Sequence, residues 1–396
     1  MSVKRRRTYR CRFYPTPKQA GVPERTFGCA RYVYNWALRV RTDAYYRRRE
    51  RASYAETSAA LTALMREPQT AWLNEVSSIP AQQALRHLDK VFRHFFEGRA
   101  RYPTFRKKRE RQAAEYTTSA FRWDAGTHAL TLAKMESPLA IRWSRPLPKG
   151  VWPSTVRVGR DGARRYFVSI LIEEEIAPLP PVATVVGIDL GLHDVVVLNS
   201  GEKIGNPIFF QADEKRVAKA QRRLAKKQRG SSNRDKARRG VDRTHVRIAD
   251  RRSDFLHKLS TRLIRENQTI CVESLRVKAM IKHPTLAKAI QDVGWGEFVS
   301  QLEYKAQWYG RALVKIDKWY PSSKRCFACG HVLGSLSLDT RRWTCPECGG
   351  IHDRDVNAAQ TVLAAGLAVS AYGEAVRPGR VRPPSAGLGE VGIPRL

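Results

Sequence analysis

The feature that most constrains the fold is a pair of C-x2-C motifs. Cys326 and Cys329 form the first pair, Cys345 and Cys348 form the second, and fifteen residues separate the two pairs. This spacing is typical of a four-cysteine zinc site that is built from two tight turns. Four thiolates fill a tetrahedral shell and leave no position open for water or substrate. The sequence therefore predicts one structural Zn²⁺ in a zinc ribbon.

An acidic segment directly follows the second cysteine pair. His352, Asp353, Arg354, Asp355 and Asn357 precede an alanine-rich apolar run that predicts a helix. A carboxylate at the entrance of this helix would be held in place by the ribbon. We therefore interpret the zinc as a structural ion that stabilises the local fold, and an acid beside it as the functional group.

The charge balance indicates a polyanionic partner. The chain of 396 residues contains 72 Lys and Arg against 37 Asp and Glu, which gives a formal net charge of +35. A surplus of this size favours nucleic acid as the partner. No apolar run has the length of a membrane span and no signal-peptide pattern is present, so we expect a soluble intracellular protein without a membrane partner. Cys11, Cys29 and Cys271 lie singly in apolar surroundings, which predicts buried free thiols.

Length and pattern predict a multidomain α+β fold. Alternating strand patterns near the N-terminus predict a small β-barrel-like unit, and a stretch with helical spacing predicts a bundle inserted into it. A proline-rich linker leads to a further domain of strands and helices that contains the ribbon, and a tail rich in Gly and Pro is expected to be disordered. The predicted bounds are residues 1–23 and 98–176 for the β-barrel-like unit, 24–97 for the bundle, 177–182 for the linker, 183–320 and 350–371 for the further domain, 321–349 for the ribbon and 372–396 for the tail.

Two patterns near the N-terminus have alternative interpretations. Residues 3–14 alternate basic with aromatic or apolar side chains, so they predict either an ordinary edge strand or a strand that contacts phosphates. The first helix is expected from Glu24, with Pro23 in its first turn. Aromatic residues at helical spacing are interpreted as core rather than as platforms for nucleobases, namely Trp36, Tyr45, Trp72, Phe92 and Phe96.

Two further basic segments favour contact with nucleic acid. The run RKKRERQ follows an aromatic segment, and backbone contact is at least as reasonable there as a solvated face. A very basic helix after residue 213 is polar nearly all round and cannot lie in a core, so we prefer a phosphate-binding role to a solvated spacer. The cations predicted to contact nucleic acid are Arg106, Lys107, Lys108, Arg222, Arg223, Lys226 and Lys227.

Acids also stand at the ends of two predicted strands. Asp189 ends one apolar strand, and Glu273 ends another. A buried carboxylate is costly unless it accepts hydrogen bonds or binds a cation, so each acid is either satisfied by backbone N–H groups or holds a metal. Together with Asp355, these acids are the hard oxygen ligands that Mg²⁺ selects, and two such ions can cleave a phosphodiester. No P-loop, G-x-S-x-G or H-E-x-x-H motif competes with this interpretation.

Several motifs resemble one known family. The segments VGIDLGLHD, ICVESL, VGWGEFVSQLEYKAQWYG, SSKRCFACG, WTCPECG and HDRDVNAA, in this order, resemble the TnpB family of transposon-associated nucleases, which are compact relatives of type V CRISPR effectors. FYPTPKQ and FGCARYVYNWAL are similar to the opening of the same family. The resemblance spans about residues 8–362.

The resemblance implies a RuvC-like, RNase H-type nuclease domain with the inserted zinc ribbon, and a wedge domain for the β-barrel-like unit. It implies that Asp189, Glu273 and Asp355 hold two Mg²⁺ ions, with Asp353 as the second choice for the third acid. It also implies a guide RNA derived from the transposon end, a double-stranded DNA target beside a short adjacent motif, and a monomer in the cytoplasm of a prokaryote, associated with the nucleoid. The matching positions for reading the adjacent motif are Tyr54, Ser58, Ser78 and Gln82.

The chain departs from the family pattern at two places. Thr361 stands where the family usually has Asn, and Gly21 to Pro23 interrupts what is commonly a longer helix. All three acids are retained, which favours an RNA-guided DNA endonuclease. Two alternatives remain: an RNA-guided DNA-binding repressor that does not cut, and a transposase that joins strands.

Overall fold

The computed structural model describes residues 3–337 and 339–372, and it divides into two compact units. The first unit comprises residues 1–177 and 213–249, and the second comprises residues 178–212 and 250–396. The boundary at Ala177 falls at the start of the segment predicted as a linker, whereas residues 213–249 group with the first unit and not with the predicted nuclease domain. The finer division into wedge, bundle and nuclease domains stays a prediction, and the tail from residue 373 lies outside the described residues.

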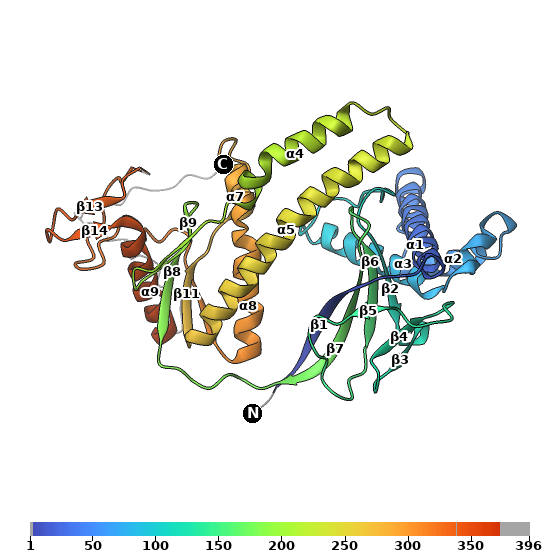
Figure 1. Ribbon diagram of the computed structural model, residues 1–396, viewed down its shortest axis with the longest axis horizontal. Helices are drawn as coiled ribbons and strands as arrows, with labels where there is room; N and C mark the ends of the chain where they lie inside the picture. Colours follow the sequence, from blue (N-terminus) through green and yellow to red (C-terminus); the bar gives the residue numbers. More distant parts are fainter. Residues whose placement is uncertain (1–2, 338, 373–396) are drawn as a thin grey trace, which may run out of the picture. The chain divides into compact units, whose positions relative to one another are not determined.

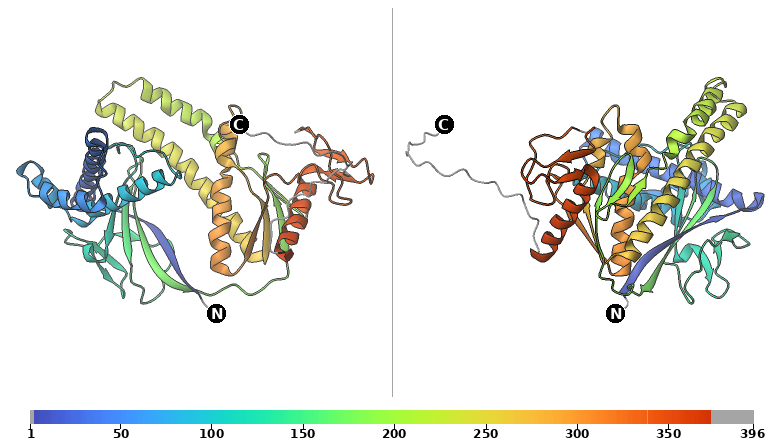
Figure 2. Two further views of the ribbon diagram at one scale, coloured as in Figure 1. Left: turned by 180° about the vertical axis from the view of Figure 1, so that it is seen from behind. Right: turned by 60° about the vertical axis from the view of Figure 1, so that its left-hand side comes forward.

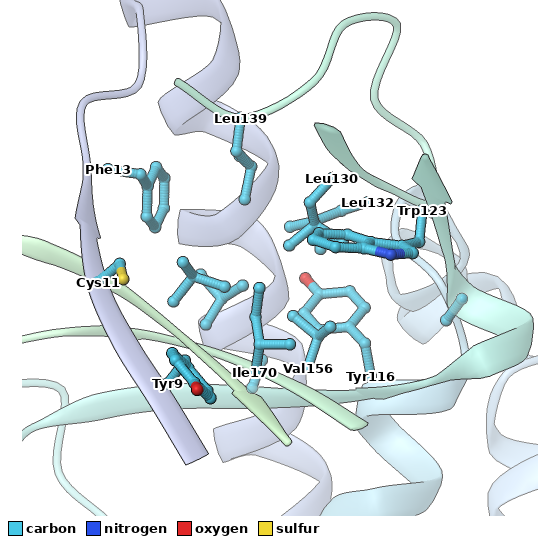
Figure 3. Packing of buried hydrophobic residues seen from close by; sticks show 14 of the residues in the cluster. Tyr9, Cys11, Phe13, Tyr116, Trp123, Leu130, Leu132, Leu139, Val156 and Ile170 are labelled. Carbon is cyan, nitrogen blue, oxygen red and sulfur yellow. The ribbon is translucent and has the colours of Figure 1, made fainter. Parts of the chain in front are cut away.

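The first unit contains a five-stranded sheet with the order β2-β6-β7-β1-β5 (Figure 1). A two-stranded hairpin, β3-β4, contributes to the same apolar core, in which Tyr116, Trp123 and Ile170 lie close to one another (Figure 3). The strands are β1 (Val3–Phe13), β2 (Gln112–Thr117), β3 (Phe121–Asp124), β4 (Ala129–Leu132), β5 (Ile141–Arg142), β6 (Thr155–Arg160) and β7 (Tyr166–Ile176).

Strand β1 is an internal strand, so the expectation of an edge strand was wrong. It pairs with β7 along its whole length, from Val3 opposite Ile176 to Phe13 opposite Tyr166. This register places its basic residues beside the acidic end of β7. Arg6 donates to Glu173 at 2.9 Å, and Arg7 to Glu174 at 3.0 Å. These two cations are therefore engaged within the sheet.

Three helices form the bundle of the first unit. Helix α1 (Pro17–Asp43) ends in a π-helical turn (Ala44–Arg48), and α2 (Tyr54–Leu64), a 3-10 turn (Pro68–Glu75) and α3 (Ile79–Phe96) follow. Their apolar faces share a core that includes Val33, Leu61 and Leu88. Helix–helix packing therefore stabilises the bundle more than helix propensity does.

Helix α1 begins earlier than its sequence predicted. Thr16 caps it, because its hydroxyl accepts the N–H of Gln19 at 3.2 Å while the Gln19 side chain accepts the N–H of Thr16 at 3.1 Å. This reciprocal capping box holds the first turn, and Pro17 suits the first helical position. Pro23 consequently lies inside the helix rather than at its start.

The aromatic residues of the bundle are more exposed than the core interpretation predicted. Phe92 is buried and Trp36 is half-buried, but Tyr45, Trp72 and Phe96 are 49%, 39% and 68% exposed. Tyr45 lies in the π-helical turn and Phe96 is the last residue of α3. Both residues therefore lie at helix ends, where fewer side chains of the neighbouring helices cover them. The core interpretation is therefore wrong for these three residues.

The second unit is built on a five-stranded sheet with the order β10-β9-β8-β11-β12. β9 is antiparallel to β8 and β10, whereas β11 is parallel to β8 and β12. The strands are β8 (Val185–Asp189), β9 (Asp194–Leu198), β10 (Lys203–Gly205), β11 (Thr269–Glu273) and β12 (Ala312–Ile316).

Helices cover both faces of this sheet. Alternate residues of β11 point to opposite sides: Ile270 and Val272 pack with α5 (Ser232–Glu266) and α8 (Trp295–Tyr309), and Cys271 packs with α9 (Arg354–Tyr372). Both views in Figure 2 show α8 and α9 on opposite sides of the strands. The remaining helices are α4 (Phe209–Ala225), α6 (Val277–Met280) and α7 (Ala287–Val293).

The cysteine-rich segment between β12 and α9 contains one small hairpin, β13 (Arg342–Thr344) paired with β14 (Ile351–Asp353). Cys11, Cys29 and Cys271 are buried and free, as predicted. Across residues 3–337 and 339–372, no helix is both long enough and apolar enough to cross a bilayer.

Candidate active site and metal centre

Asp189 and Glu273 end neighbouring parallel strands. The register pairs Ile188 of β8 with Val272 of β11, so the next residue along each strand is one of these two acids. Parallel strands end at the same edge of a sheet, which explains how residues far apart in the chain come together. Asp355 lies in the first turn of α9, the helix packed on β8 and β11.

The three acids share one electrostatic environment. Burial and the negative charges of Glu273 and Asp355 together raise the pKa of Asp189 to about 8, against the opposing effect of Arg354. Burial also raises the pKa of Glu273, although a hydrogen bond from Ser322 acts in the opposite direction. The three carboxylates are half-buried, and acids that lie beside one another in such surroundings favour a proton or a cation between them.

Asp353 and Asp355 have different partners. Oδ1 of Asp353 accepts the backbone N–H groups of Asp355 and Val356, each at 3.1 Å, and Oδ2 accepts from Lys203 at 2.7 Å. Burial alone would raise the pKa of Asp353, but these hydrogen bonds lower it. Asp353 therefore caps α9. Asp355 is the acid of this segment whose negative charge raises the pKa of Asp189. Oδ2 of Asp355 lies 3.4 Å from Nη1 of Arg341.

The four predicted zinc ligands converge. Sγ of Cys329 lies 3.6 Å from that of Cys345, and Sγ of Cys326 lies 3.7 Å from that of Cys348. Within residues 3–337 and 339–372, these four are the one group of three or more His, Cys, Asp and Glu residues whose ligand atoms all lie within 4.8 Å of one another. The three carboxylates are therefore neighbours but do not form so compact a set.

Each cysteine pair lies on the same kind of turn. The N–H of Gly330 donates to the carbonyl of Cys326, and the N–H of Gly349 donates to that of Cys345, both at 2.9 Å. Both glycines have positive φ, 80° and 70°, in the left-handed region that side chains disfavour. Four thiols at these distances fit a Zn²⁺ ion, which a thiolate set of this kind selects.

Three side chains support these sites in roles that the sequence did not reveal. The Ser322 hydroxyl donates to Glu273. Nε2 of His352 lies 3.1 Å from Sγ of Cys326, and the His352 ring packs on Trp343. Asn357 accepts the N–H of Phe327 at 2.9 Å. The motifs SSK, HDRD and NAA contain these residues, but their partners are known only once distant segments are brought together.

The positions expected to read a DNA motif lie on α2 and at the start of α3. Tyr54 begins α2 and its hydroxyl accepts from Arg86 of α3 at 3.3 Å. Ser78 precedes α3, and its carbonyl accepts the N–H of Gln82 at 3.0 Å. Together with Ser58, these residues are half-buried. No described contact tests their role.

The first predicted basic run is engaged in part within the protein. Arg106 stacks over the ring of Tyr34 at 3.7 Å, and its backbone N–H donates to Asn35 at 2.8 Å. Burial lowers the pKa of Arg106. Lys107 and Lys108 are exposed. The two lysines, and not Arg106, are therefore placed for a partner in solution.

The second predicted basic run borders a groove in the helical pair α4 and α5. The groove has a volume of about 880 Å³ and no acidic residue lines it among the described residues. Three of the four cations predicted there are among its lining residues, and Arg222 is not. The cations of this basic groove are Arg216, Lys219, Arg223, Lys226, Lys227 and Lys236.

Three sequence profiles match successive parts of the chain. A helix-turn-helix domain (HTH_OrfB_IS605) matches residues 1–50, the profile described as "Probable transposase" (OrfB_IS605) matches residues 168–283, and the "Cas12f1-like, TNB domain" matches residues 295–362. The last two matches include the strand ends, the ribbon and the start of α9.

Relatives and a solved structure agree with these profiles. A Streptomyces pristinaespiralis protein named "Putative RNA-guided DNA endonuclease" is 55% identical, with 95% of this chain and 93% of the relative aligned. The Escherichia coli protein named "Putative RNA-guided DNA endonuclease InsQ" is 30% identical, with 96% of each chain aligned. A solved Cas12f1 complex with guide RNA and target DNA has a similar fold, with a TM-score of 0.56 at 13% identity over 91% of this chain and 98% of that chain. The chain therefore belongs to the TnpB family of the OrfB type that its motifs resemble.

Proposed function

We propose that this protein is an RNA-guided DNA endonuclease that hydrolyses double-stranded DNA beside a short adjacent motif. The observation that carries the proposal is the half-buried acidic site at the ends of β8 and β11, where desolvation and the charges of Glu273 and Asp355 raise the pKa of Asp189. The names of the two relatives support the same activity. We assign Asp189, Glu273 and Asp355 as the catalytic acids.

The sheet of the second unit supports a RuvC-like, RNase H-type nuclease domain. Three sequential antiparallel strands are followed by two strands parallel to the first, in the order β10-β9-β8-β11-β12. Acids at the carboxyl ends of the central strands suit this arrangement. In the first unit, the sheet and the β3-β4 hairpin around one core support a β-barrel-like wedge domain.

We assign two Mg²⁺ ions to the acidic site. Its donors are hard carboxylate oxygens, and the raised pKa values of Asp189 and Glu273 reflect buried charge that a cation would offset. When bound, such ions polarise the phosphate and activate water for attack. Ser322 orients Glu273 through its hydrogen bond, and Asp353 fixes the helical turn that presents Asp355. The four cysteines fit one structural Zn²⁺.

The expected partners are a guide RNA from the transposon end and the target DNA. The cations of the basic groove suit a phosphate backbone, because they have no acidic neighbour in its described lining. Tyr54, Ser58, Ser78 and Gln82 remain our assignment for the adjacent motif. We propose a monomer in the prokaryotic cytoplasm, associated with the nucleoid.

The decisive experiment uses the full chain purified with the RNA that accompanies it. A plasmid that matches the variable end of this RNA should be cut in Mg²⁺, and Asp189→Asn should lower the rate by more than about a hundredfold. Asp339→Asn, which changes an exposed acid of the ribbon, should cut as the parent does. Equal cutting by Asp189→Asn and the parent would refute the assigned site.

Two other results would replace this function. Guide-dependent binding without nicking at any Mg²⁺ concentration would indicate a repressor. Joined donor and target strands would indicate a transposase, which is what the description of the profile at residues 168–283 names.

A further inference from the structure

Trp319 presents an exposed indole on an ordered turn that follows β12. Its side chain is 72% exposed, so it contributes little to the core. The turn is held by its own hydrogen bonds: the N–H of Trp319 donates to Oδ1 of Asp317 at 2.7 Å, and the N–H of Tyr320 donates to the carbonyl of Asp317 at 3.2 Å. The ring is therefore presented by a defined backbone.

Two contacts tie this turn to the acidic site. The Ser322 hydroxyl donates to Glu273, and the guanidinium of Arg276 lies 5.9 Å from the centre of the Trp319 ring. Glu273 and Arg276 are three residues apart, so the same end of β11 meets the turn at both of these points. The turn that presents the indole is consequently anchored at Glu273, one of the carboxylates that we assign to catalysis.

The surroundings of Trp319 favour a nucleobase as its ligand. Nζ of Lys318 lies 5.2 Å from the ring centre, and Arg276 is a second cation against the ring. Flat rings of this kind stack on any base, and adjacent cations offset the phosphates on either side. A protein-docking surface would instead need a contiguous apolar patch, whereas two cations lie against this ring.

We propose that Trp319 is a positioning residue that stacks on a base of single-stranded DNA next to the phosphate held at the acidic site. The inference rests on the proposed endonuclease function. Stacking would hold the strand in register with Asp189, Glu273 and Asp355. Arg276 and Lys318 would contact the flanking phosphates.

The test places a fluorescent adenine analogue, which stacking quenches, at successive positions of the DNA strand. The full chain carries its guide RNA and Asp189→Asn, so that the strand remains intact during the measurement. Quenching should peak at one or two adjacent positions, and Trp319→Ala should abolish that peak while Trp319→Phe retains most of it.

In the cleaving protein, Trp319→Ala should slow single-turnover cutting roughly tenfold, which is the size of one lost stacking interaction. Assembly with guide and target, followed by gel shift, should not change.

Trp152→Ala is the matched control, because Trp152 is also exposed, at 68%, but lies in the first unit. It should leave both quenching and cutting unchanged. An unchanged quenching peak in Trp319→Ala would overturn the inference. The exposed ring would then bind a different ligand, such as a protein. If the parent makes no guide-dependent cut, the endonuclease proposal fails. Quenching of the labelled single strand by the protein without guide RNA still tests the role of Trp319 by itself.

Discussion

Asn357 of α9 is hydrogen-bonded to Phe327, the residue that follows Cys326, the first cysteine of the cluster. Its Oδ1 accepts the N–H of Phe327 at 2.9 Å, and its Nδ2 donates to the carbonyl of Arg325 at 2.7 Å. Asn357 is buried and lies two residues after Asp355. One side chain therefore fixes the turn of the first cysteine pair against the helical turn that carries Asp355.

Asn357→Leu should uncouple the ribbon from the acid. The substitution removes both hydrogen bonds and leaves the N–H of Phe327 and the carbonyl of Arg325 unsatisfied, at a cost of about 1–3 kcal/mol for each group that stays buried. We expect DNA cleavage to fall more than tenfold while zinc content stays at one ion per chain, as measured by elemental analysis.

Thr361→Val is the control for this prediction. Its hydroxyl donates to the carbonyl of Asn357 at 2.7 Å within the same helix and does not reach the ribbon. It should cut at nearly the parent rate. Equal losses in the two variants would mean that α9 itself, and not its link to the ribbon, is sensitive.

Gly187→Ala should displace α9 from the sheet. A Cβ atom at this position of β8 would lie 2.6 Å from Cβ of Leu363 and 2.8 Å from its backbone N, closer than packed atoms allow. Such overpacking costs about 1–3 kcal/mol, and it would move Asp355 relative to Asp189. We expect a lower midpoint of denaturant unfolding together with slower cleavage.

Gly296→Ala is the matched substitution in α8, where an added Cβ meets no atom within 4 Å. It should leave cleavage unchanged and stabilise the helix by up to about 1 kcal/mol. If Gly187→Ala is as stable and as active as the parent, close packing of α9 on β8 does not position the third acid.

The strands of the second unit were the most predictable part of the fold. β8 and β11 are short apolar runs with clear ends, and each ends at the acid, Asp189 or Glu273, that was expected there. The placement of Asp189 and Glu273 at strand ends follows from the same local pattern. Their meeting at one edge depends on the parallel pairing of β8 and β11, which only the complete fold provides.

Long-range pairing explains what the sequence did not reveal. Residues 3–14 carry no local sign that an acidic segment more than 150 residues away would neutralise Arg6 and Arg7. The same limit applies to Ser322 and Asn357, because an ordinary polar residue becomes a supporting group only through its partner. The exposure of Phe96 was missed because periodicity gives the face of a helix but not where its neighbours end.

In the protein without Mg²⁺, the contribution of Asp189 to stability should fall as pH rises. The ordinary pKa of an aspartate is about 3.9, and burial beside Glu273 and Asp355 raises that of Asp189 to about 8. Between these values the folded chain binds more protons than the unfolded chain, so the stabilising contribution is complete below about pH 4 and is lost as pH rises through about 8.

Urea unfolding in a chelator of Mg²⁺ that leaves zinc bound would measure this effect. Asp189→Asn should flatten the dependence of the unfolding free energy on pH, whereas Asp339→Asn should keep it. Added Mg²⁺ should stabilise the parent more at high pH, because metal ligands must be deprotonated. Parallel curves for the parent and Asp189→Asn would contradict the raised pKa.

Removal of the zinc should unfold the ribbon and abolish cleavage indirectly. Cys345→Ser deletes one of four thiolates. Burial opposes ionisation of Cys345, but hydrogen bonds from backbone N–H groups lower its pKa and favour the thiolate form. We expect zinc content to fall well below one ion per chain and protease to cut within residues 321–349.

Cys29→Ala is the control, because Cys29 is buried in the bundle and takes no part in the cluster. It should retain the zinc. Full cleavage by a protein stripped of zinc and supplied only with Mg²⁺ would contradict a structural role for the site.

The basic groove should account for a measurable part of the salt dependence of RNA binding. Arg223→Glu combined with Lys226→Glu reverses two of its cations. Each phosphate contact that is lost should reduce the slope of log K against log salt concentration by about one.

The same change in net charge at Lys134 and Lys149, which are exposed residues elsewhere in the first unit, is the matched control. Filter binding of the co-purified RNA over a range of salt should give a reduced slope for the groove variant alone. Equal slopes for the two double variants would assign the effect to overall charge and not to the groove, since both have the same net charge.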